Sequence, residues 1–462
     1  MKEINNIKEV YFIGIGGIGM SALARYFKAK GKKVSGYDKT ETVLSKQLVQ
    51  EGIPVYYEDD EKYIAKGADI IVYTPAVPKE HKGLLYYRQN GYPVLKRSDV
   101  LGEITKSSFN ICIAGTHGKT TITTMTAHLL RHSGYGCNAF LGGIAANYNS
   151  NFWSSERNVC VVEADEYDRS FLKLQPDIAA ISAMDADHLD IYGTEDKMQQ
   201  AFVDFAGKVK KGGTLLSKYG LAKENDLKAD HHLTYSLQNN NANAYAANIA
   251  NREGGYTFDA YINDRWLKDI ELNMGGLHNI ENAVAAIAIA KQLHIEDEKI
   301  KAAVAAFKGV KRRFEYIIPP AGKKATVYID DYAHHPAELE ALIKGVKLLF
   351  ADKKCTVVFQ PHLFSRTRDL AEAFAASLDM ADEVILLPVY PARELPVEGV
   401  TSRLILDKMK NEYKHLMNKE ETLNWIRKHY DKNKPGVLIT SGAGDIDQMV
   451  QAVKGILEGG KW

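Results

Sequence analysis

The chain of 462 residues is poor in three features that would indicate particular classes of protein. Its 59 Lys and Arg residues are nearly balanced by 58 Asp and Glu residues, which leaves a net charge of +1. Proteins that bind nucleic acid over a broad surface normally carry a strong basic excess, so we expect no nucleic-acid partner. No run of about 18 apolar residues occurs, and we therefore expect no membrane-spanning helix.

Cysteine is the third scarce feature, with four residues that form no C-x-x-C pair. They are Cys112, Cys137, Cys160 and Cys355, mostly within apolar runs. This placement favours buried free thiols over disulfides or zinc ligands, and such thiols are typical of a reducing compartment. The N-terminal residues MKEINNIKEV also lack the apolar stretch of a signal peptide. We therefore expect a cytoplasmic protein.

The sequence does contain a regular alternation of short apolar runs with helical patterns. The runs are rich in Val and Ile, and they cover residues 10–15, 69–73, 110–114, 158–163, 178–182, 356–359, 383–389 and 436–440. Such alternation predicts an α/β fold with parallel sheets covered by helices. At roughly 150 residues per domain, the length predicts about three domains. Apolar residues make up 45% of the chain and charged residues 25%, values that argue against large disordered regions.

Two changes in composition predict the domain boundaries. Residues 96–108 are polar and precede a new strand, so we expect a first domain at residues 1–105. The basic cluster Lys311-Arg312-Arg313 and the pair Pro319-Pro320 follow a helical stretch, which predicts domains at 106–310 and 311–462. Asn-rich turns and alternating residues at 223–272 predict antiparallel strands inserted late in the middle domain.

A first glycine-rich loop lies between an expected strand at 10–13 and an expected helix at 20–30. Its residues Gly14, Gly16 and Gly19 match G-x-G-x-x-G, and Asp38 follows 19 residues later. Bare backbone N–H groups at a helix N-terminus can bind a diphosphate, and an acidic residue at this distance can bind ribose. The pattern favours a nucleotide diphosphate over a plain turn but leaves NAD and a UDP-sugar open. The candidate loop residues are Gly14, Gly16, Gly17, Ile18 and Gly19.

A second glycine-rich loop, AGTHGKTT at residues 114–121, resembles a Walker A loop without its first glycine. In such loops the Lys119 ammonium pairs with the β- and γ-phosphates of ATP, and the Thr120 hydroxyl is a ligand of Mg²⁺. The position between a strand and a helix favours ATP binding over a chance match. The candidate residues are Gly115, Thr116, His117, Gly118, Lys119, Thr120 and Thr121.

Carboxylates gather at the ends of the next two expected strands. Glu163 directly follows an apolar strand, at the place where enzymes with this loop hold Mg²⁺, so we take it as a metal ligand. His188 lies among carboxylates in the segment 184–190. It is either a surface histidine or part of a second metal site, and we include it as a candidate.

Polar residues also mark the start of an alanine-rich helix and three places in the last third of the chain. Asn279 and Asn282 are spaced to share one helix face, where they either cap the helix or contact adenine. The later clusters occupy residues 311–315, 330–336 and 360–367. Ligands of open α/β sheets bind at the carboxyl ends of strands, so these clusters predict a site. A His and an Arg together can bind a carboxylate.

In this order, nine segments resemble the Mur ligases of peptidoglycan synthesis over essentially the whole chain. The segments are GIGGIGMSALA, YTPAVP, AGTHGKTT, VVEADEYDRSFL, DADHLDIYG, HNIENAVAA, GVKRRFE, DDYAHHPAE and FQPHLFSRT. The resemblance implies a Rossmann-like N-terminal domain for a UDP-sugar, a central P-loop ATPase domain, and a Rossmann-like C-terminal domain for an amino acid. It is strongest to members that use ATP and Mg²⁺ to join L-alanine to UDP-N-acetylmuramate through an acyl phosphate.

The resemblance also implies roles for individual residues. It places the first glycine loop at the UDP diphosphate site, and Asp38 and Thr74 are further candidates for binding this substrate. It assigns Lys119 and Thr120 to the ATP phosphates and Mg²⁺, Glu163 and His188 to metal ions, and Asn279 and Asn282 to adenine. It places Arg313 and Asp331 near the γ-phosphate and ribose, and His334, His362 and Arg366 near the incoming amino acid. The catalytic candidates are Lys119, His188, Arg313 and His334.

Two departures from the family pattern bear on specificity. Residues 198–207 contain no lysine, whereas family members that add other amino acids usually carry a carbamylated lysine there. Leu363 stands where many members that add L-alanine have an arginine. The alternatives are a ligase that recycles a tripeptide onto the same sugar nucleotide, an NAD-dependent oxidoreductase and a non-catalytic nucleotide-binding regulator. We expect a monomer or a homodimer.

Overall fold

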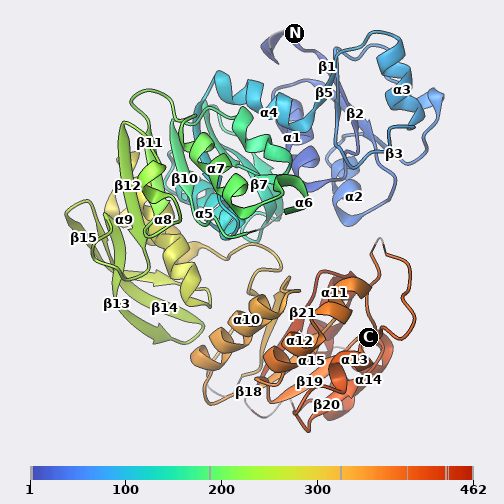
Figure 1. The fold of residues 1–462 in the computed structure, drawn as a ribbon, viewed down its shortest axis with the longest axis vertical. Helices are drawn as coiled ribbons and strands as arrows, with labels where there is room; N and C mark the ends of the chain where they lie inside the picture. Colours follow the sequence, from blue (N-terminus) through green and yellow to red (C-terminus); the bar gives the residue numbers. More distant parts are fainter. Residues whose placement is uncertain are drawn as a thin grey trace. The chain divides into compact units, whose positions relative to one another are not determined.

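The computed structural model describes residues 4–186, 189–322, 325–392, 394–431, 434 and 436–459. Its strands form three sheets, drawn from blue to red along the chain in Figure 1. All three combine parallel strands with helices, which confirms the predicted α/β class. The chain divides into two compact units, Met1–Ala247 with Ala260–Leu267 and Glu281–Val304, and Asn248–Asp259 with Lys268–Ile280 and Ala305–Trp462.

The first sheet is entirely parallel, with the strand order β3-β2-β1-β4-β5. Its strands are β1 (Glu9–Ile13), β2 (Lys33–Tyr37), β3 (Val55–Tyr56), β4 (Ile70–Tyr73) and β5 (Val94–Lys96). The accompanying helices are α1 (Ile18–Ala29), α2 (Val43–Gln50), α3 (Lys82–Gln89) and α4 (Arg97–Lys106), with 3₁₀ turns η1 (Ile4–Asn6) and η2 (Glu61–Tyr63). The chain leaves β1 for one side of the sheet and returns to β4 on the other. This is the switch point at which open α/β sheets bind ligands.

The second sheet has ten strands in the order β15-β14-β13-β12-β11-β10-β6-β9-β7-β8. The strands are β6 (Phe109–Ala114), β7 (Asn138–Ala145), β8 (Ser150–Trp153), β9 (Val159–Glu163), β10 (Ile178–Ile181), β11 (Thr214–Lys218), β12 (His231–Ser236), β13 (Ala244–Arg252), β14 (Gly255–Ile262) and β15 (Arg265–Leu272). The helices are α5 (Lys119–His132), α6 (Leu189–Tyr192), α7 (Glu195–Ala206), α8 (Leu277–Gln292) and α9 (Asp297–Ala306), with η3 (Tyr167–Lys173) and η4 (Glu224–Asp226). Strands β9, β6 and β10 are parallel neighbours, so their carboxyl ends meet at one edge.

The predicted antiparallel insertion at 223–272 is wrong for its first strand. Strand β12 pairs in parallel with β11, and β13 pairs in parallel with β12 over two residue pairs. Strand β14 follows β13 through residues 253–254, and β15 follows β14 through residues 263–264. Only these connections of the insertion are short enough for antiparallel hairpins. In β14 buried and half-buried residues alternate, as its sequence pattern predicts. Alternation indicates a strand with one buried face, but it carries no information on the direction of the neighbouring strand.

The third sheet has the order β16-β17-β21-β18-β19-β20 and is parallel except at β16. Its strands are β16 (Glu315–Ile318), β17 (Val327–Asp331), β18 (Lys354–Phe359), β19 (Glu383–Leu386), β20 (Lys414–Leu416) and β21 (Gly436–Ser441). The helices are α10 (Pro336–Leu349), α11 (Phe364–Asp369), α12 (Ala371–Leu378), α13 (Arg403–Leu406), α14 (Lys419–His429) and α15 (Val450–Leu457), with η5 (Asp445–Met449). Strand β19 ends at Leu386, short of the expected 389, because Pro388 cannot donate to a ladder.

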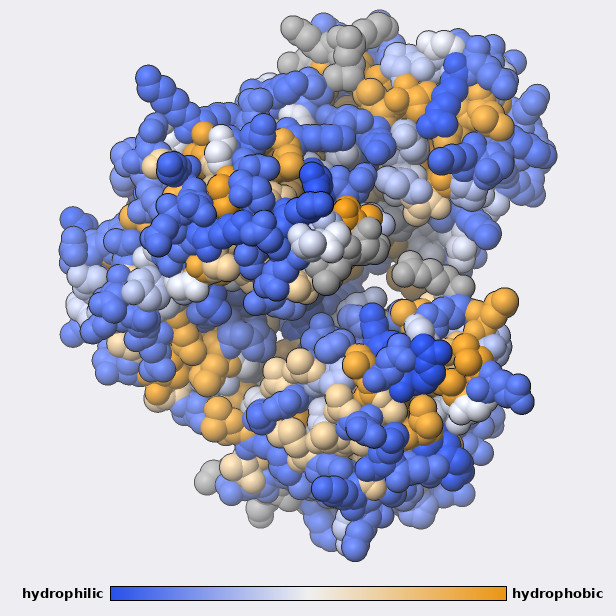
Figure 2. All heavy atoms as spheres, viewed as in Figure 1, coloured by the Kyte–Doolittle hydropathy of each residue, from blue (hydrophilic) through white to orange (hydrophobic). Residues whose placement is uncertain are grey.

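Buried side chains of the first two sheets form one continuous hydrophobic core in the first unit. The link is helix α1, whose Tyr26 ring packs against Phe140 of β7 and Phe152 of β8, with ring centroids 5.4 and 6.2 Å apart. The four cysteines are buried and free, as predicted. Among the described residues no helix is long and apolar enough to cross a membrane. Hydrophilic side chains cover most of the face drawn in Figure 2.

Candidate active site

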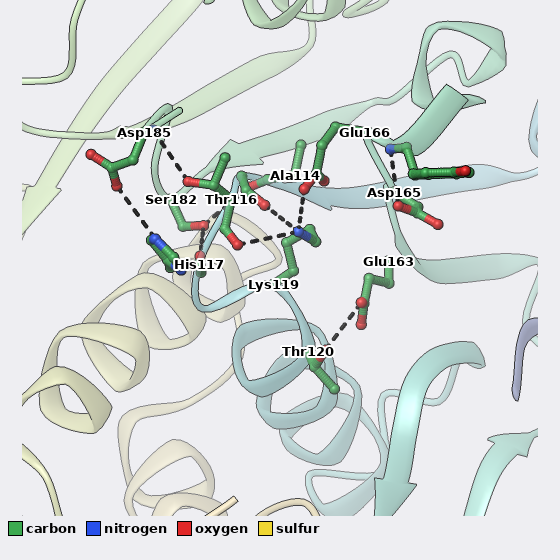
Figure 3. Close-up of polar contacts among 12 residues, drawn as sticks. Ala114, Thr116, His117, Lys119, Thr120, Glu163, Asp165, Glu166, Ser182 and Asp185 are labelled. Carbon is green, nitrogen blue, oxygen red and sulfur yellow. Dashed lines mark hydrogen bonds and ion pairs between the residues drawn. The ribbon is translucent and has the colours of Figure 1, made fainter. Parts of the chain in front are cut away.

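The second glycine-rich loop joins the end of β6 to the start of α5, as predicted (Figure 3). Gly115 and Gly118 have φ angles of +134° and +80°, a region that favours glycine. A Cβ at Gly115 would lie 2.2 Å from Ser182 Oγ, so no side chain fits there. The loop therefore brings backbone N–H groups to the N-terminus of the 14-residue helix α5, an arrangement that binds phosphate.

Lys119 lies folded over this loop. Its Nζ donates to Gly115 O at 2.5 Å and pairs with Glu166 Oε1 at 2.7 Å. The Glu166 side chain is 1% exposed, and Tyr192 donates to the Glu166 carbonyl at 2.6 Å. Burial raises the pKa of Glu166, while the Lys119 ammonium opposes this shift. Glu166 was not among the predicted site residues, although it lies in the same run of acids as Glu163.

Thr120 and Glu163 meet at the start of α5, as predicted for a metal site. Thr120 Oγ1 donates to Glu163 Oε1 at 3.0 Å, and the N–H of Gly142 donates to Glu163 Oε2 at 3.0 Å. A hydroxyl and a carboxylate are ligands that suit Mg²⁺, which usually keeps phosphate and water oxygens as its other ligands. In the described ranges no group of three His, Cys, Asp or Glu side chains could hold a metal ion by itself. His188 lies outside the described residues.

The end of β10 supports the other side of the phosphate loop. Ser182 Oγ donates to the His117 carbonyl, and Thr116 N–H donates to the Ala183 carbonyl at 3.2 Å. The backbone N–H of Asp185 donates to Thr116 Oγ1 at 3.2 Å. His117 lies 3.7 Å from the Asp185 carboxylate in Figure 3. These contacts fix the loop, whereas Thr121 is buried within α5.

The two asparagines of α8 have different surroundings. A Cβ at Gly118 would lie 2.9 Å from Asn282 Oδ1, so this amide lies against the phosphate loop. Asn279 Nδ2 donates to the Gly275 carbonyl at 2.7 Å, just before the helix. Asn279 therefore acts at the start of α8, and Asn282 is the amide that the structure brings to the loop.

The first glycine-rich loop lies at the switch point of its sheet. Gly14 has φ +87°, and a Cβ there would lie 2.6 Å from Thr74 Cγ2, which follows β4. Gly17 is the N-cap of α1, and Ile18 and Gly19 are in its first turn. Asp38 Oδ2 accepts the N–H of Gly16 at 2.7 Å. In this structure the Asp38 carboxylate therefore stabilises the loop.

In the second unit, Asp331 ends β17 and holds the segment that carries Arg313. Its Oδ2 accepts the N–H of Phe314 at 2.6 Å, and its Oδ1 accepts the N–H of Ala333 at 2.7 Å. Burial raises the pKa of Asp331 to about 6. Arg312 and Phe314 have φ angles of +60° and +49°. The exposed Arg313 is thus presented by a constrained turn.

His334, His362 and Arg366 come together at the carboxyl ends of β17 and β18. The two imidazole centroids are 6.1 Å apart, and His362 stacks on Tyr390 with centroids 5.9 Å apart. His334 Nδ1 donates to the Tyr332 carbonyl at 2.9 Å, and burial lowers the pKa of His334. Within the described part of the chain, Arg366 Nη1 is buried without a hydrogen-bond partner. Tyr390 was not predicted, since no motif in the neighbouring sequence indicates a site.

Comparisons with known proteins cover nearly the entire chain. Three family models match: "Mur ligase family, catalytic domain" at residues 9–109, "Mur ligase middle domain" at 113–290 and "Mur ligase, glutamate ligase domain" at 312–444. A UDP-N-acetylmuramate–L-alanine ligase of Flavobacterium johnsoniae is 46% identical over 98% of this chain and 99% of its own. The enzyme of the same name from Porphyromonas gingivalis strain W83 is 48% identical over the same shares.

Solved structures agree with this pattern. The UDP-N-acetylmuramate-alanine ligase of Thermotoga maritima superposes with a TM-score of 0.82 at 27% identity, over 98% of this chain and 99% of that one. A murein peptide ligase of Psychrobacter arcticus has a TM-score of 0.66 at 22% identity, over 97% and 98% of the two chains. The second likeness concerns the fold alone.

Proposed function

The chain belongs to the Mur ligase family, and we propose that it joins L-alanine to the lactyl carboxylate of UDP-N-acetylmuramate in peptidoglycan precursor synthesis. The observation that carries this proposal is an identity of 46–48% with relatives of this name over 98% of the chain. We assign the UDP-sugar to residues 1–105, ATP to residues 106–310 and the amino acid to residues 311–462. The protein acts in the cytoplasm as a monomer or a homodimer.

Our proposal places the phosphates of ATP at the loop before α5. When ATP binds, the Lys119 ammonium leaves Glu166 and pairs with the β- and γ-phosphates. The N-terminal N–H groups of α5 bind further phosphate oxygens. Thr120 and Glu163 would hold Mg²⁺, which would neutralise charge on the phosphates. Asn282 supplies an amide beside the loop, and Asn279 remains a candidate for adenine. His188 remains the candidate for a second metal ion.

The proposed chemistry consists of two displacements. A lactyl carboxylate oxygen bonds to the γ-phosphorus while the bond to ADP breaks, which yields an acyl phosphate. The amine of L-alanine then bonds to the acyl carbon, and the tetrahedral intermediate releases phosphate. Lys119 and Arg313 stabilise the negative charge that the phosphoryl oxygens carry during transfer. Asp331 positions Arg313 and remains a candidate for the ribose of ATP.

For the amino acid, we propose a role for each member of the His334 cluster. Because His334 Nδ1 donates to Tyr332, its Nε2 is left as an acceptor. The lowered pKa keeps the ring neutral at neutral pH, so Nε2 can take a proton from the attacking amine. Arg366 binds the carboxylate of L-alanine through its unpartnered Nη1 with His362 beside it. Leu363 supplies no charge, so Arg366 carries this contact.

A coupled phosphate-release assay with ATP, Mg²⁺ and UDP-N-acetylmuramate tests the proposal. We expect release with L-alanine and a loss of at least about a hundredfold in Lys119→Met. The exposed cation Lys106, on α4, serves as a matched control as Lys106→Met. Release with the tripeptide but without L-alanine would identify the recycling ligase instead. Reduction of NAD without ADP formation would point to an oxidoreductase, and a wild type inert with every amino acid to a regulator.

A further inference from the structure

The first glycine-rich loop contains no cation that could balance a diphosphate. Residues 13–22 read IGIGGIGMSA, without Lys or Arg. Among the described residues, the only charged side chain that hydrogen-bonds to this loop is Asp38, which accepts the N–H of Gly16. The N-terminus of a helix contributes only about half a positive charge. A nucleoside diphosphate carries more negative charge than this, so a cation from another part of the chain would strengthen its binding.

Arg97 lies directly against this loop from another element. It is the first residue of α4, which follows the carboxyl end of β5. The glycine-rich loop follows the carboxyl end of β1, which runs parallel to β5 in the first sheet. A Cβ added at Gly19 would lie 2.9 Å from Arg97 Nη1 and 3.2 Å from its Cζ. The guanidinium therefore packs against the bare Cα of Gly19, in the first turn of α1. Glycine at this position leaves room for the cation.

The partner of Arg97 in the described structure is a weak one. Arg97 Nη2 lies 3.5 Å from Asp165 Oδ2, and the two side chains are 25% and 43% exposed. An ion pair at this length and exposure contributes little to stability. Guanidinium has five N–H donors in a planar fork suited to phosphate, so a single distant carboxylate leaves most of its capacity unused.

We propose that Arg97 binds the diphosphate of UDP-N-acetylmuramate and exchanges Asp165 for it. This assignment rests on the proposed function. Asp165 lies between Glu163 and Glu166 in the segment drawn in Figure 3. The exchange therefore takes place beside the residues that serve the ATP phosphates. Asp165 holds the guanidinium near the loop before the sugar nucleotide arrives.

Isothermal titration of the full chain with UDP-N-acetylmuramate, without ATP, tests the assignment. We expect Arg97→Met to raise the Kd by about ten- to a hundredfold, as for loss of charge-assisted hydrogen bonds. Arg97→Lys should recover only part of the affinity, because an ammonium cannot bind bidentately. The matched control is Lys96→Met, which removes the neighbouring cation that lies 3.5 Å from Asp168. Its Kd should stay within about twofold of the wild type.

Salt separates a direct contact from a disturbed fold. Between about 50 and 500 mM KCl the wild-type affinity should fall, and that of Arg97→Met should fall less, because a screened ion pair is already missing. An unchanged Kd in Arg97→Met would overturn the role of Arg97. So would a higher Kd in this variant that depends on salt as strongly as the wild-type Kd does. A wild-type chain that does not bind UDP-N-acetylmuramate would instead overturn the proposed function.

Discussion

At the scale of single residues, substitutions of two glycines at the ends of α5 distinguish the effect of backbone strain from the effect of losing a functional contact. Gly118 and Gly134 both have φ +80°, but a Cβ would meet Asn282 Oδ1 at 2.9 Å at the first and nothing within 4 Å at the second. We expect Gly134→Ala to cost about 1–2 kcal/mol of stability without changing the KM for ATP. Gly118→Ala carries the same strain and also displaces Asn282, so its KM for ATP should rise about tenfold or more. Phosphate-release kinetics and thermal melting measure both effects, and equal KM values would contradict the role of Asn282.

Asp330 is a second residue whose surroundings predict a measurable effect. It is 2% exposed, accepts from Thr440 Oγ1 at 2.6 Å and lies 3.3 Å from Arg312 Nε. Burial raises the pKa of Asp330 from 3.8 to about 7. Between these values the folded state holds a proton that the unfolded state has lost, so stability falls as pH rises from 4 to 7.

In Asp330→Asn this contribution is absent. The free energy of unfolding of the variant relative to the wild type should therefore rise with pH, by on the order of 3 kcal/mol across this window. Urea unfolding of both proteins at several pH values from 4 to 8 gives the difference. A difference that does not change with pH would show that Asp330 is ionised throughout.

Sequence patterns predicted the residues that lie at a recognisable place in a strand, loop or helix. Lys119, Thr120 and Glu163 were predicted because each lies at the end of a strand or the start of a helix, and the structure brings them together. Glu166 and Arg97 were missed because neither lies in a glycine-rich loop or directly after one of the expected strands. Arg97 meets Gly19 across 78 positions, and no local pattern records such a contact.

At the scale of elements, the attachment of α1 depends on one buried cation. Arg25 is 7% exposed, pairs with both oxygens of Glu51 at 2.8 Å, and donates through Nη1 to Asn151 of β8. We expect Arg25→Met to lose about 1–3 kcal/mol of stability, less than for a fully buried pair because Glu51 regains water. The exposed Lys30, just after the same helix, is the matched control as Lys30→Met, with a loss below about 1 kcal/mol. Equal losses in urea unfolding would contradict this role of Arg25.

The sequence pattern of an element predicted whether it is a strand or a helix better than it predicted which other elements it contacts. Period and composition placed all eight expected strands, because a strand buried on both faces is a continuous apolar run. Residues 97–106 were described only as a polar boundary, yet they form helix α4, whose Val100, Leu101 and Ile104 are buried. Apolar residues spaced by one and three positions within a charged segment are only a weak indication of a helix.

At the scale of the whole chain, length predicted about three domains, and the structure has three sheets. Contacts nevertheless place the first sheet and most of the second in one compact unit. The reason lies in α1, which buries Met20, Leu23 and Phe27 and turns Tyr26 to β7 and β8. A helix with two buried faces does not reveal from its sequence which sheet each face contacts. The domain boundary at residue 105 therefore stays a prediction, which assigns different ligands to the residues before and after it.

This shared core leads to a prediction about the coupling of the first two sheets. Asn151 of β8 donates through Nδ2 to Ile18 O at 2.5 Å and to Ser21 Oγ at 2.9 Å, in the first turn of α1. We expect a sugar nucleotide bound at the glycine loop to order this turn, and we expect Asn151 to transmit the restraint to β8. UDP-N-acetylmuramate alone should therefore slow hydrogen exchange in peptides covering residues 138–153 as well as in those covering the loop.

Hydrogen-exchange mass spectrometry of the full chain measures this directly. Strand β17, in the other compact unit, is the internal reference and should keep its exchange rate. In Asn151→Ala the loop should still be protected by the sugar nucleotide, whereas protection of residues 138–153 should fall, because the three hydrogen bonds between Asn151 and α1 are gone. Protection confined to the loop in the wild type would mean that the first sheet responds to its ligand independently. Protection retained in Asn151→Ala would mean that the packing of Tyr26 is sufficient to couple the two sheets.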